Sequence, residues 1–96
     1  MEKKVVVSKR FRRNVSSVYE YLLQEYSAKI AFSFLDKLQT RVDFIIQNPE
    51  TGKPSQIKPE VRSTLLLPHN RVYYRFSKDK IELLCVFDMR KKNKPY

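Results

Sequence analysis

Residues 61–88 read VRSTLLLPHNRVYYRFSKDKIELLCVFD, and this stretch decides the fold. It contains three runs rich in β-branched, leucine and aromatic residues, at about 61–67, 71–76 and 81–88, separated by Pro68-His69-Asn70 and by the polar segment 77–80. Short runs of this kind, broken by turn residues, predict consecutive antiparallel strands. The third run is almost continuously apolar, which is typical of a strand covered on both faces.

The first two predicted strands alternate in side-chain direction, because residues two apart share a face. The second strand is therefore divided into an apolar set and a polar set, which are Val72, Tyr74 and Phe76, and Arg71, Tyr73 and Arg75. The same rule groups Arg62, Thr64 and Leu66 on the first strand. If that group shares a face with the polar set, the open side of the sheet is basic and aromatic, as a nucleic-acid surface would be.

Two helices are predicted upstream of these strands, after a short strand at residues 5–7. Ser8 and Ser27 are suitable N-caps, and Asn48-Pro49 ends the second helix because a residue before proline avoids the helical conformation. Apolar residues recur every three or four positions in both segments. The two stripes are Phe11, Val15, Val18, Leu22 and Tyr26, over roughly 9–26, and Ile30, Phe34, Leu38, Val42 and Ile45.

The order of elements is strand, two helices, three strands (β-α-α-β-β-β), with an irregular connection at residues 49–59. Almost no loop separates the helices, so they must form an antiparallel hairpin. We therefore expect an α+β fold in one domain, residues 1–96, with the hairpin on one face of a small, mostly antiparallel sheet. Tyr19, Tyr21 and Tyr26 are expected to pack in the core or within the hairpin.

Charge and composition restrict the function. Twenty Lys and Arg against ten Asp and Glu give a formal charge of +10, which favours acidic or polyanionic partners. Cys85 is the single cysteine and lies in an apolar run, so a disulfide framework and a cysteine zinc site are excluded. The start of the chain is neither a signal peptide nor a membrane span, so a cytoplasmic protein with no membrane partner is expected.

The sequence has no carboxylate pair, metal-ligand cluster or Ser-His-Asp arrangement, so neither a metal nor a cofactor is expected. His69, the sole histidine, is interpreted as a turn residue. Cleavage of RNA beside a 2′-hydroxyl would need a base, an acid and cations around the phosphorane. Arginines suit the last role, whereas Tyr96 could act as a base only with a lowered pKa.

Three stretches taken in order resemble the RelE/ParE family of bacterial toxins. They are FLDKLQTRVDFIIQNPETGKPS (residues 34–55), VRSTLLLPHNRVYYRF (residues 61–76) and KIELLCVFDMRKKNKP (residues 80–95). The resemblance implies the toxin of a type II toxin–antitoxin pair. The long hairpin and the NPETGKPS exit are more similar to ParE-like toxins, which poison DNA gyrase, than to RelE-like toxins, which cut mRNA on the ribosome.

The RelE-like nuclease pattern can be compared with this chain position by position. It implies catalytic roles for Arg62, Arg71, Arg90 and Tyr96, but Thr64 stands where that pattern has a lysine. This missing charge favours gyrase poisoning, with the mRNA interferase and an inactive nucleic-acid-binding relative as alternatives. The residues expected to bind a nucleic acid or another target are Arg62, Tyr73, Arg75, Arg90, Lys91 and Lys92.

The resemblance also implies partners. A cognate antitoxin is expected to wrap the toxin with an acidic segment that folds on binding, which gives a toxin–antitoxin hetero-oligomer. The expected target is DNA gyrase or, for a RelE-like activity, the ribosome with its mRNA.

Overall fold

The computed structural model describes residues 3–96. Its elements are β1 (Lys4–Val7), α1 (Lys9–Glu25), α2 (Ala28–Gln47), the short 3₁₀ helix η1 (Pro49–Thr51), β2 (Lys53–Pro54), β3 (Val61–Leu67), β4 (Asn70–Phe76) and β5 (Lys80–Asp88). One sheet has the strand order β1-β5-β4-β3-β2, in which β1 is parallel to β5 and the other neighbours are antiparallel. The predicted α+β fold is confirmed, with β2 as an additional short edge strand.

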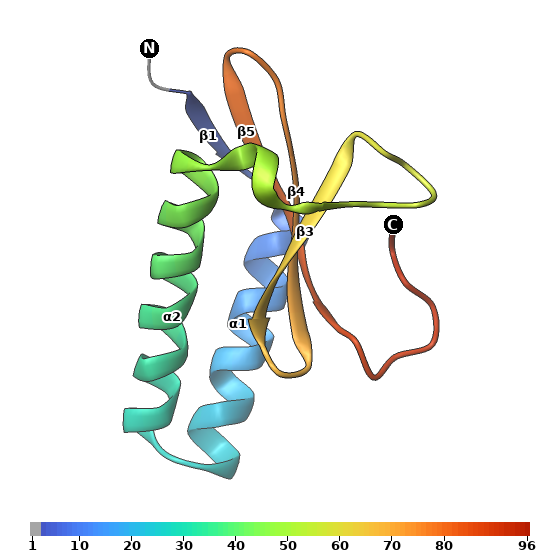
Figure 1. The fold of residues 1–96 in the computed structure, drawn as a ribbon. Helices are drawn as coiled ribbons and strands as arrows, with labels where there is room; N and C mark the ends of the chain where they lie inside the picture. The colour runs from blue at the N-terminus through green and yellow to red at the C-terminus, as the bar shows by residue number, and fades with distance from the viewer. Residues whose placement is uncertain (1–2) are drawn as a thin grey trace.

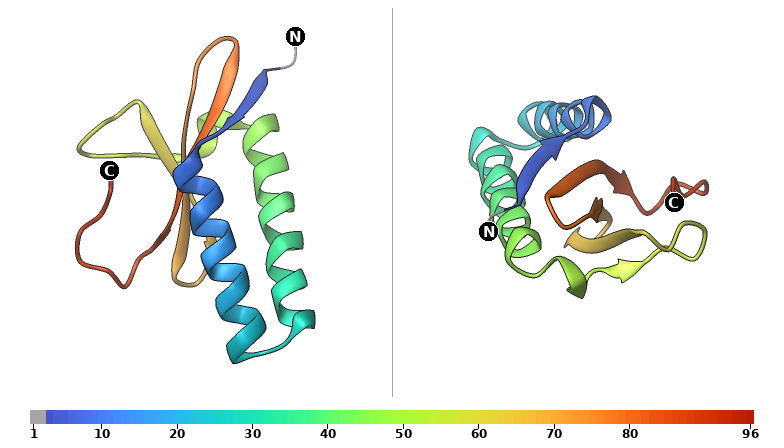
Figure 2. Two further views of the ribbon diagram at one scale, coloured as in Figure 1. Left: turned by 180° about the vertical axis from the view of Figure 1, so that it is seen from behind. Right: turned by 90° about the horizontal axis from the view of Figure 1, so that it is seen from above.

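The two helices cover one face of the sheet, and the C-terminal tail lies on the other (Figure 1). Both predicted N-caps are confirmed, since the Ser8 and Ser27 hydroxyls accept hydrogen bonds from the backbone N–H of Phe11 and Ile30. Seen from behind and from above, the hairpin, the curved sheet and the tail form successive layers (Figure 2). This arrangement leaves the open face of the sheet to the tail and to the loop between β2 and β3.

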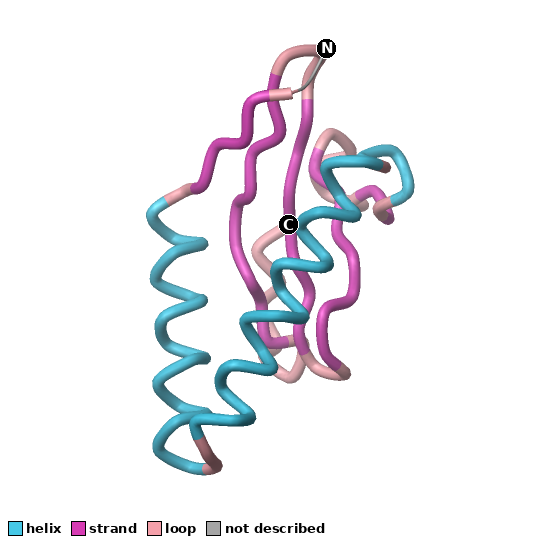
Figure 3. The backbone as a smooth tube through the Cα atoms, turned by 90° about the vertical axis from the view of Figure 1, so that its left-hand side faces the viewer, coloured by secondary structure: helices cyan, strands magenta, loops and turns pink. Residues whose placement is uncertain are grey.

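The larger core lies between the sheet and the helices. It joins β4 and β5 to the inner stripes of both helices, through Phe11, Phe34, Leu38, Ile45, Val72, Tyr74, Ile81, Leu83 and Val86. The predicted apolar stripes are wrong at two positions, because Tyr26 is 60% exposed and Ile30 is 44% exposed instead of being buried. Both residues lie next to the turn between α1 and α2, and this tip of the hairpin runs past the end of the sheet (Figures 1 and 3). Tyr21 is also exposed rather than buried.

A β-bulge in β5 determines which residues reach the open face. Tyr73 pairs with Cys85 but Tyr74 pairs with Leu83, so Leu84 is an extra residue on β5. Such an insertion reverses the alternation of side chains beyond it. Ile81 and Leu83 therefore face the helices together with Val86, whereas Cys85 and Phe87 face the other side. Two side chains from the N-terminal part of the chain form hydrogen bonds with backbone groups at the bulge. Ser8 Oγ donates to Leu84 O, and Asn14 Oδ1 accepts from Val86 N–H.

A second, smaller core lies on the open face. Val61, Tyr73, Cys85 and Phe87 are buried there, and Tyr96 of the tail packs against them. The strand register places Ser63 opposite Tyr73 and Arg62 opposite Tyr74. The sequence left open whether Arg62, Thr64 and Leu66 share a face with Arg71, Tyr73 and Arg75, and the register shows that the two groups lie on opposite faces. Residues directly opposite in an antiparallel pair share a face, so Arg62 and Thr64 lie on the helix side.

Candidate functional site

A cleft of about 230 Å³ lies on the open face, between the β2–β3 loop and the tail. Tyr73 and Phe87 line it from the sheet, Arg71 lies among them, and Lys94 and Tyr96 line it from the tail. In Figure 1 the tail curls outward from β5 and returns so that the C-terminus lies near this loop. The cleft combines aromatic surface with positive charge, which suits a nucleotide or an acidic peptide.

Arg71 is held in a fixed orientation inside this cleft. Its Nε donates to Ser63 Oγ at 3.0 Å, and its Nη2 donates to the Ser63 carbonyl oxygen at 3.3 Å. Ser63 is a buried polar residue on the neighbouring strand. A guanidinium oriented in this way can present its remaining N–H groups to a phosphate or carboxylate. The contact with Ser63 could not be predicted from the sequence, since it depends on the strand register.

Two tyrosine rings pack against each other in the cleft, with their planes tilted by 41°. The ring centroids of Tyr73 and Tyr96 are 5.6 Å apart, and Phe87 meets Tyr73 edge-on at 6.2 Å. Burial raises the pKa of the Tyr73 hydroxyl above its usual value, although the charge of Arg71 opposes this. Tyr73 is therefore a neutral phenol at physiological pH, which suits it to stacking and packing rather than to acting as a general base.

Arg62 lies on the far side of the sheet from this cleft. Its Nη1 donates to the carbonyl oxygens of Glu50 and Gly52, at 3.0 and 2.9 Å. Tyr74 holds the same loop, because its hydroxyl donates to Pro49 O at 2.7 Å and accepts from Gly52 N–H at 3.1 Å. Arg62 thus fixes the segment that leads from α2 into the sheet.

Arg75 shares a face with Tyr73 but is ion-paired. Its Nε and Nη2 each lie 3.2 Å from a carboxylate oxygen of Glu82, directly across on β5. Lys80 also contacts Glu82, at 3.6 Å. The hydrogen bond from Arg75 lowers the pKa of the Glu82 carboxyl; burial opposes this, and the charges of Arg75 and Lys80 add to the lowering. The pair is solvent-exposed, so Arg75 belongs to the basic surface, but Glu82 offsets part of its positive charge.

Arg90 and Lys91 line a different hollow, between α1 and the ends of β4 and β5. Arg90 binds Asp88 in a two-pronged ion pair, with Nε to Oδ1 at 3.0 Å and Nη2 to Oδ2 at 2.8 Å. This interaction lowers the pKa of the Asp88 carboxyl to about 2. The hollow has a volume of about 450 Å³ and is called the α1 groove below. Arg90 and Arg71 therefore face separate sites.

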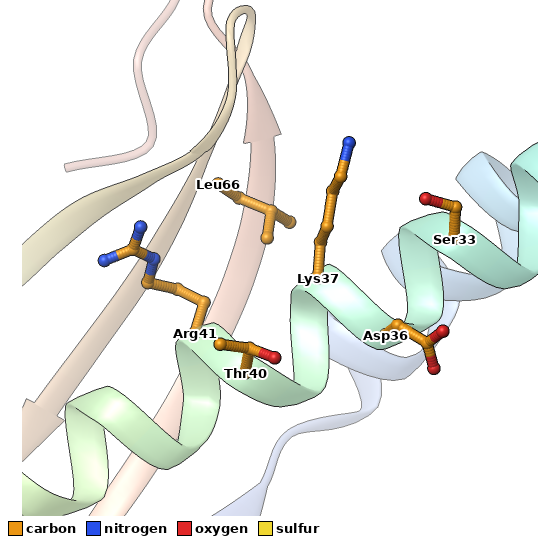
Figure 4. Close-up of a pocket in the computed structure, with 6 residues that line it drawn as sticks. All are labelled: Ser33, Asp36, Lys37, Thr40, Arg41 and Leu66. Atoms are coloured by element: carbon orange, nitrogen blue, oxygen red, sulfur yellow. The ribbon is translucent and has the colours of Figure 1, made fainter.

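A third hollow, of about 270 Å³, lies beside α2 and β3 (Figure 4). Lys37 and Arg41 are one turn apart on α2, and Leu66 of β3 lies across from them. Of the residues predicted as sites, Lys92 is exposed on the tail and lines none of these three hollows.

The part of the chain that the structure describes has no group of three or more His, Cys, Asp or Glu side chains arranged to hold a metal ion. Within residues 3–96, no helix is long and apolar enough to cross a membrane.

The fold resembles those of toxin–antitoxin proteins. One solved structure, the chromosomal ParDE toxin–antitoxin system of P. aeruginosa, matches with a TM-score of 0.77 and 16% identity, over 91% of this chain and 96% of the other. The E. coli DinJ–YafQ toxin–antitoxin complex matches with a TM-score of 0.68 and 11% identity, over 94% and 96%. The YoeB dimer of Staphylococcus aureus matches with a TM-score of 0.60 and 16% identity, over 88% and 94%. At these identities the likeness shows a shared fold.

The fold is thus one shared with proteins solved from toxin–antitoxin systems. A family model described as "ParE toxin of type II toxin-antitoxin system, parDE" matches residues 5–93. The chain therefore belongs to the ParE toxin family of type II toxin–antitoxin systems. A search of curated proteins finds no match.

Proposed function

We propose that this toxin arrests growth by poisoning DNA gyrase, through binding rather than through RNA cleavage. The observation that carries the proposal is the dispersal of the four residues expected for a nuclease. Arg71 and Tyr96 line the cleft, but Arg62 binds loop carbonyls on the opposite face and Arg90 is paired with Asp88 in the α1 groove. Cleavage would need such groups around one phosphate. The match to the ParE family model supports the same conclusion.

In this proposal the cleft holds a segment of the target. Arg71 supplies a fixed cation, and the adjacent rings of Tyr73 and Tyr96 supply aromatic surface beside it. Lys92 and Lys94 on the exposed tail, together with Arg75, extend the positive surface around it. A surface of this kind speeds encounter with an acidic target and gives the binding a strong salt dependence.

A ribosome-dependent mRNA interferase is the second candidate. The observation that favours it is the juxtaposition of Arg71 with Tyr73 and Tyr96 in one cleft, where a guanidinium could bind a phosphate while a base stacks on a ring. This function would require Arg90 to leave Asp88 and turn toward the cleft when RNA binds.

The two functions are separated by expressing the toxin alone from an inducible promoter. Gyrase poisoning predicts filamentous cells with broken DNA and intact mRNA, and Arg71→Ala should abolish the arrest. Primer extension that finds mRNA cut at ribosome-occupied codons would replace this proposal with the nuclease. Normal growth at high expression, with salt-dependent RNA binding in vitro, would indicate an inactive nucleic-acid-binding relative.

A further inference from the structure

Lysines gather at the end of the sheet that lies opposite the hairpin tip, and the proposed target contact does not use them. This group, called the basic end below, consists of Lys3, Lys4, Lys78 and Lys80. Figures 1 and 3 show that the turn between β4 and β5 lies beside the start of β1 there, and that both project beyond the helices. Lys4, Lys78 and Lys80 are exposed, so a large partner can reach them.

Hydrogen bonds hold the backbone of the basic end in place. Lys4 N–H donates to Asp79 O at 2.8 Å, and Ser77 N–H closes the turn by donating to Lys80 O at 2.9 Å. Lys3 Nζ reaches across from the start of the chain and donates to the carbonyl oxygen of Ser77. The backbone that carries these lysines is therefore fixed relative to the sheet.

The strand register brings like charges together at this end. Lys4 lies directly opposite Lys80 in the parallel pair of β1 and β5. Neighbouring strands are about 4.8 Å apart, and like charges directly opposite one another destabilise a sheet. Glu82 lies 3.6 Å from Lys80 but is shared with Arg75, and within residues 3–96 no ion pair involves Lys4. A bound polyanion would relieve this repulsion.

The excess positive charge of the chain is concentrated away from the hairpin. Residues 16–48, which form most of the hairpin, contain four acidic and three basic residues, namely Glu20, Glu25, Asp36, Asp43, Lys29, Lys37 and Arg41. The basic end combines its lysines with one carboxylate in the turn, that of Asp79. The molecule is therefore polarised from the basic end to the hairpin tip, and the basic end attracts an anionic partner.

The surroundings of the lysines indicate which polyanion fits. Single-stranded nucleic acids are held largely by aromatic rings on which their bases stack. Phe76 adjoins the turn, but Lys3 Nζ lies over its ring at 5.5 Å from the centroid and the Arg62 guanidinium lies at 5.8 Å. This ring is thus not free to stack on a base. Lysine is also depleted at protein–protein interfaces, so a duplex that presents only phosphates fits better than an acidic protein.

We propose that the basic end binds the phosphate backbone of duplex DNA without reading its sequence. Lysine ammonium groups act as compact point charges, so the contact follows the phosphates and not the base edges. If gyrase is the toxic target, this contact would place the toxin on the DNA that gyrase holds. That last step rests on the proposed function, whereas the DNA contact itself does not.

The test measures the affinity of purified, antitoxin-free toxin for a fluorescein-labelled DNA duplex of about 20 base pairs, by fluorescence anisotropy between about 50 and 200 mM NaCl. The double variant Lys4→Gln/Lys80→Gln should weaken binding about tenfold at the lowest salt concentration. It should also reduce the slope of log affinity against log salt by about 2, which is one for each lost phosphate contact.

The matched control is Lys29→Gln/Lys37→Gln, which removes the same charge from α2 and should change the affinity less than about twofold, because salt screens distant charges. Thermal melts verify that both double variants are folded. Lys78→Gln, in the exposed turn, provides a second measurement with a milder change and should reduce the salt slope by about 1.

Unchanged binding by Lys4→Gln/Lys80→Gln and Lys78→Gln would overturn the proposal. An equal loss of affinity in Lys29→Gln/Lys37→Gln would do the same, since binding would then follow net charge alone. Single-stranded RNA or polyglutamate that displaces the labelled duplex at a lower concentration than unlabelled duplex DNA would also contradict it. Because gyrase takes no part in this measurement, failure of the gyrase proposal leaves the result intact.

Discussion

The aromatic ring of Tyr96, the last residue of the chain, lies 5.6 Å from the ring of Tyr73 in the middle of β4. Tyr73 is 5% exposed and belongs to the smaller core, so the end of the tail is attached to the sheet. At its other end the tail is held by Lys91 N–H donating to Asp88 O and by the Asp88–Arg90 pair. The tail thus encloses one side of the cleft.

Removing the Tyr96 ring should release the tail. Tyr96→Ala should increase the rate of tryptic cleavage after Lys91 and Lys92 by roughly tenfold, because local opening controls access to exposed sites. Lys94 precedes proline and is a poor trypsin site. The measurement is mass spectrometry of fragments over time. Tyr96→Phe keeps the ring and should behave like wild type, and equal rates for all three proteins would contradict a ring-held tail.

Gly52 should not tolerate a side chain. A Cβ atom at this position would lie 2.1 Å from Tyr74 Oη, and Tyr74 is 1% exposed and bound to Pro49 O. Gly52→Ala should therefore lower the free energy of unfolding by about 2 kcal/mol through strain in a packed region. Urea denaturation measures this change. Lys53→Ala, at the neighbouring exposed position, should stay within about 0.5 kcal/mol of wild type, and an equally stable Gly52→Ala would show that the loop can shift.

Arg62 and Arg71 should have separable effects. Arg62→Ala removes two hydrogen bonds to the carbonyls of Glu50 and Gly52, and should cost about 1–2 kcal/mol of stability while leaving growth arrest at permissive temperature. Arg71→Ala should abolish growth arrest in a protein that still unfolds cooperatively. Parallel urea curves and growth assays compare the two variants. A non-toxic Arg62→Ala of wild-type stability would place Arg62 in the site after all.

The Asp88–Arg90 pair should contribute to the acid sensitivity of the fold. Because the pKa of Asp88 is lowered to about 2 in the folded protein, below its unfolded value, its contribution is present above about pH 4 and is lost as pH falls toward 2. Asp88→Asn should flatten this part of the stability profile, measured by urea midpoints between pH 2 and 7. Asp36→Asn changes an exposed carboxylate outside the ion pairs of residues 3–96 and should keep the wild-type slope.

Local sequence signals predicted the elements well. Ser8 and Ser27 cap their helices as expected, and the alternation around Tyr73 correctly separates the two faces of β4. These signals depend on neighbouring residues alone. The position of Arg62 depends instead on the register between two strands, which periodicity within one strand cannot reveal.

Other features that the sequence does not reveal arise from tertiary geometry. The bulge at Leu84 moves Cys85 and Phe87 to the open face, and an almost uniformly apolar strand gives no sign of such an insertion. Tyr26 and Ile30 have the spacing of core residues, but the hairpin extends beyond the sheet at this point.

The most direct test of the proposed function is a cleavage assay with purified DNA gyrase, supercoiled plasmid, ATP and antitoxin-free toxin. If the toxin poisons gyrase through the cleft, linear DNA should accumulate after protein denaturation in proportion to toxin, and Arg71→Ala should reduce it to background. Supercoiling that proceeds normally, with no linear DNA at a large molar excess of folded toxin, would contradict gyrase as the target.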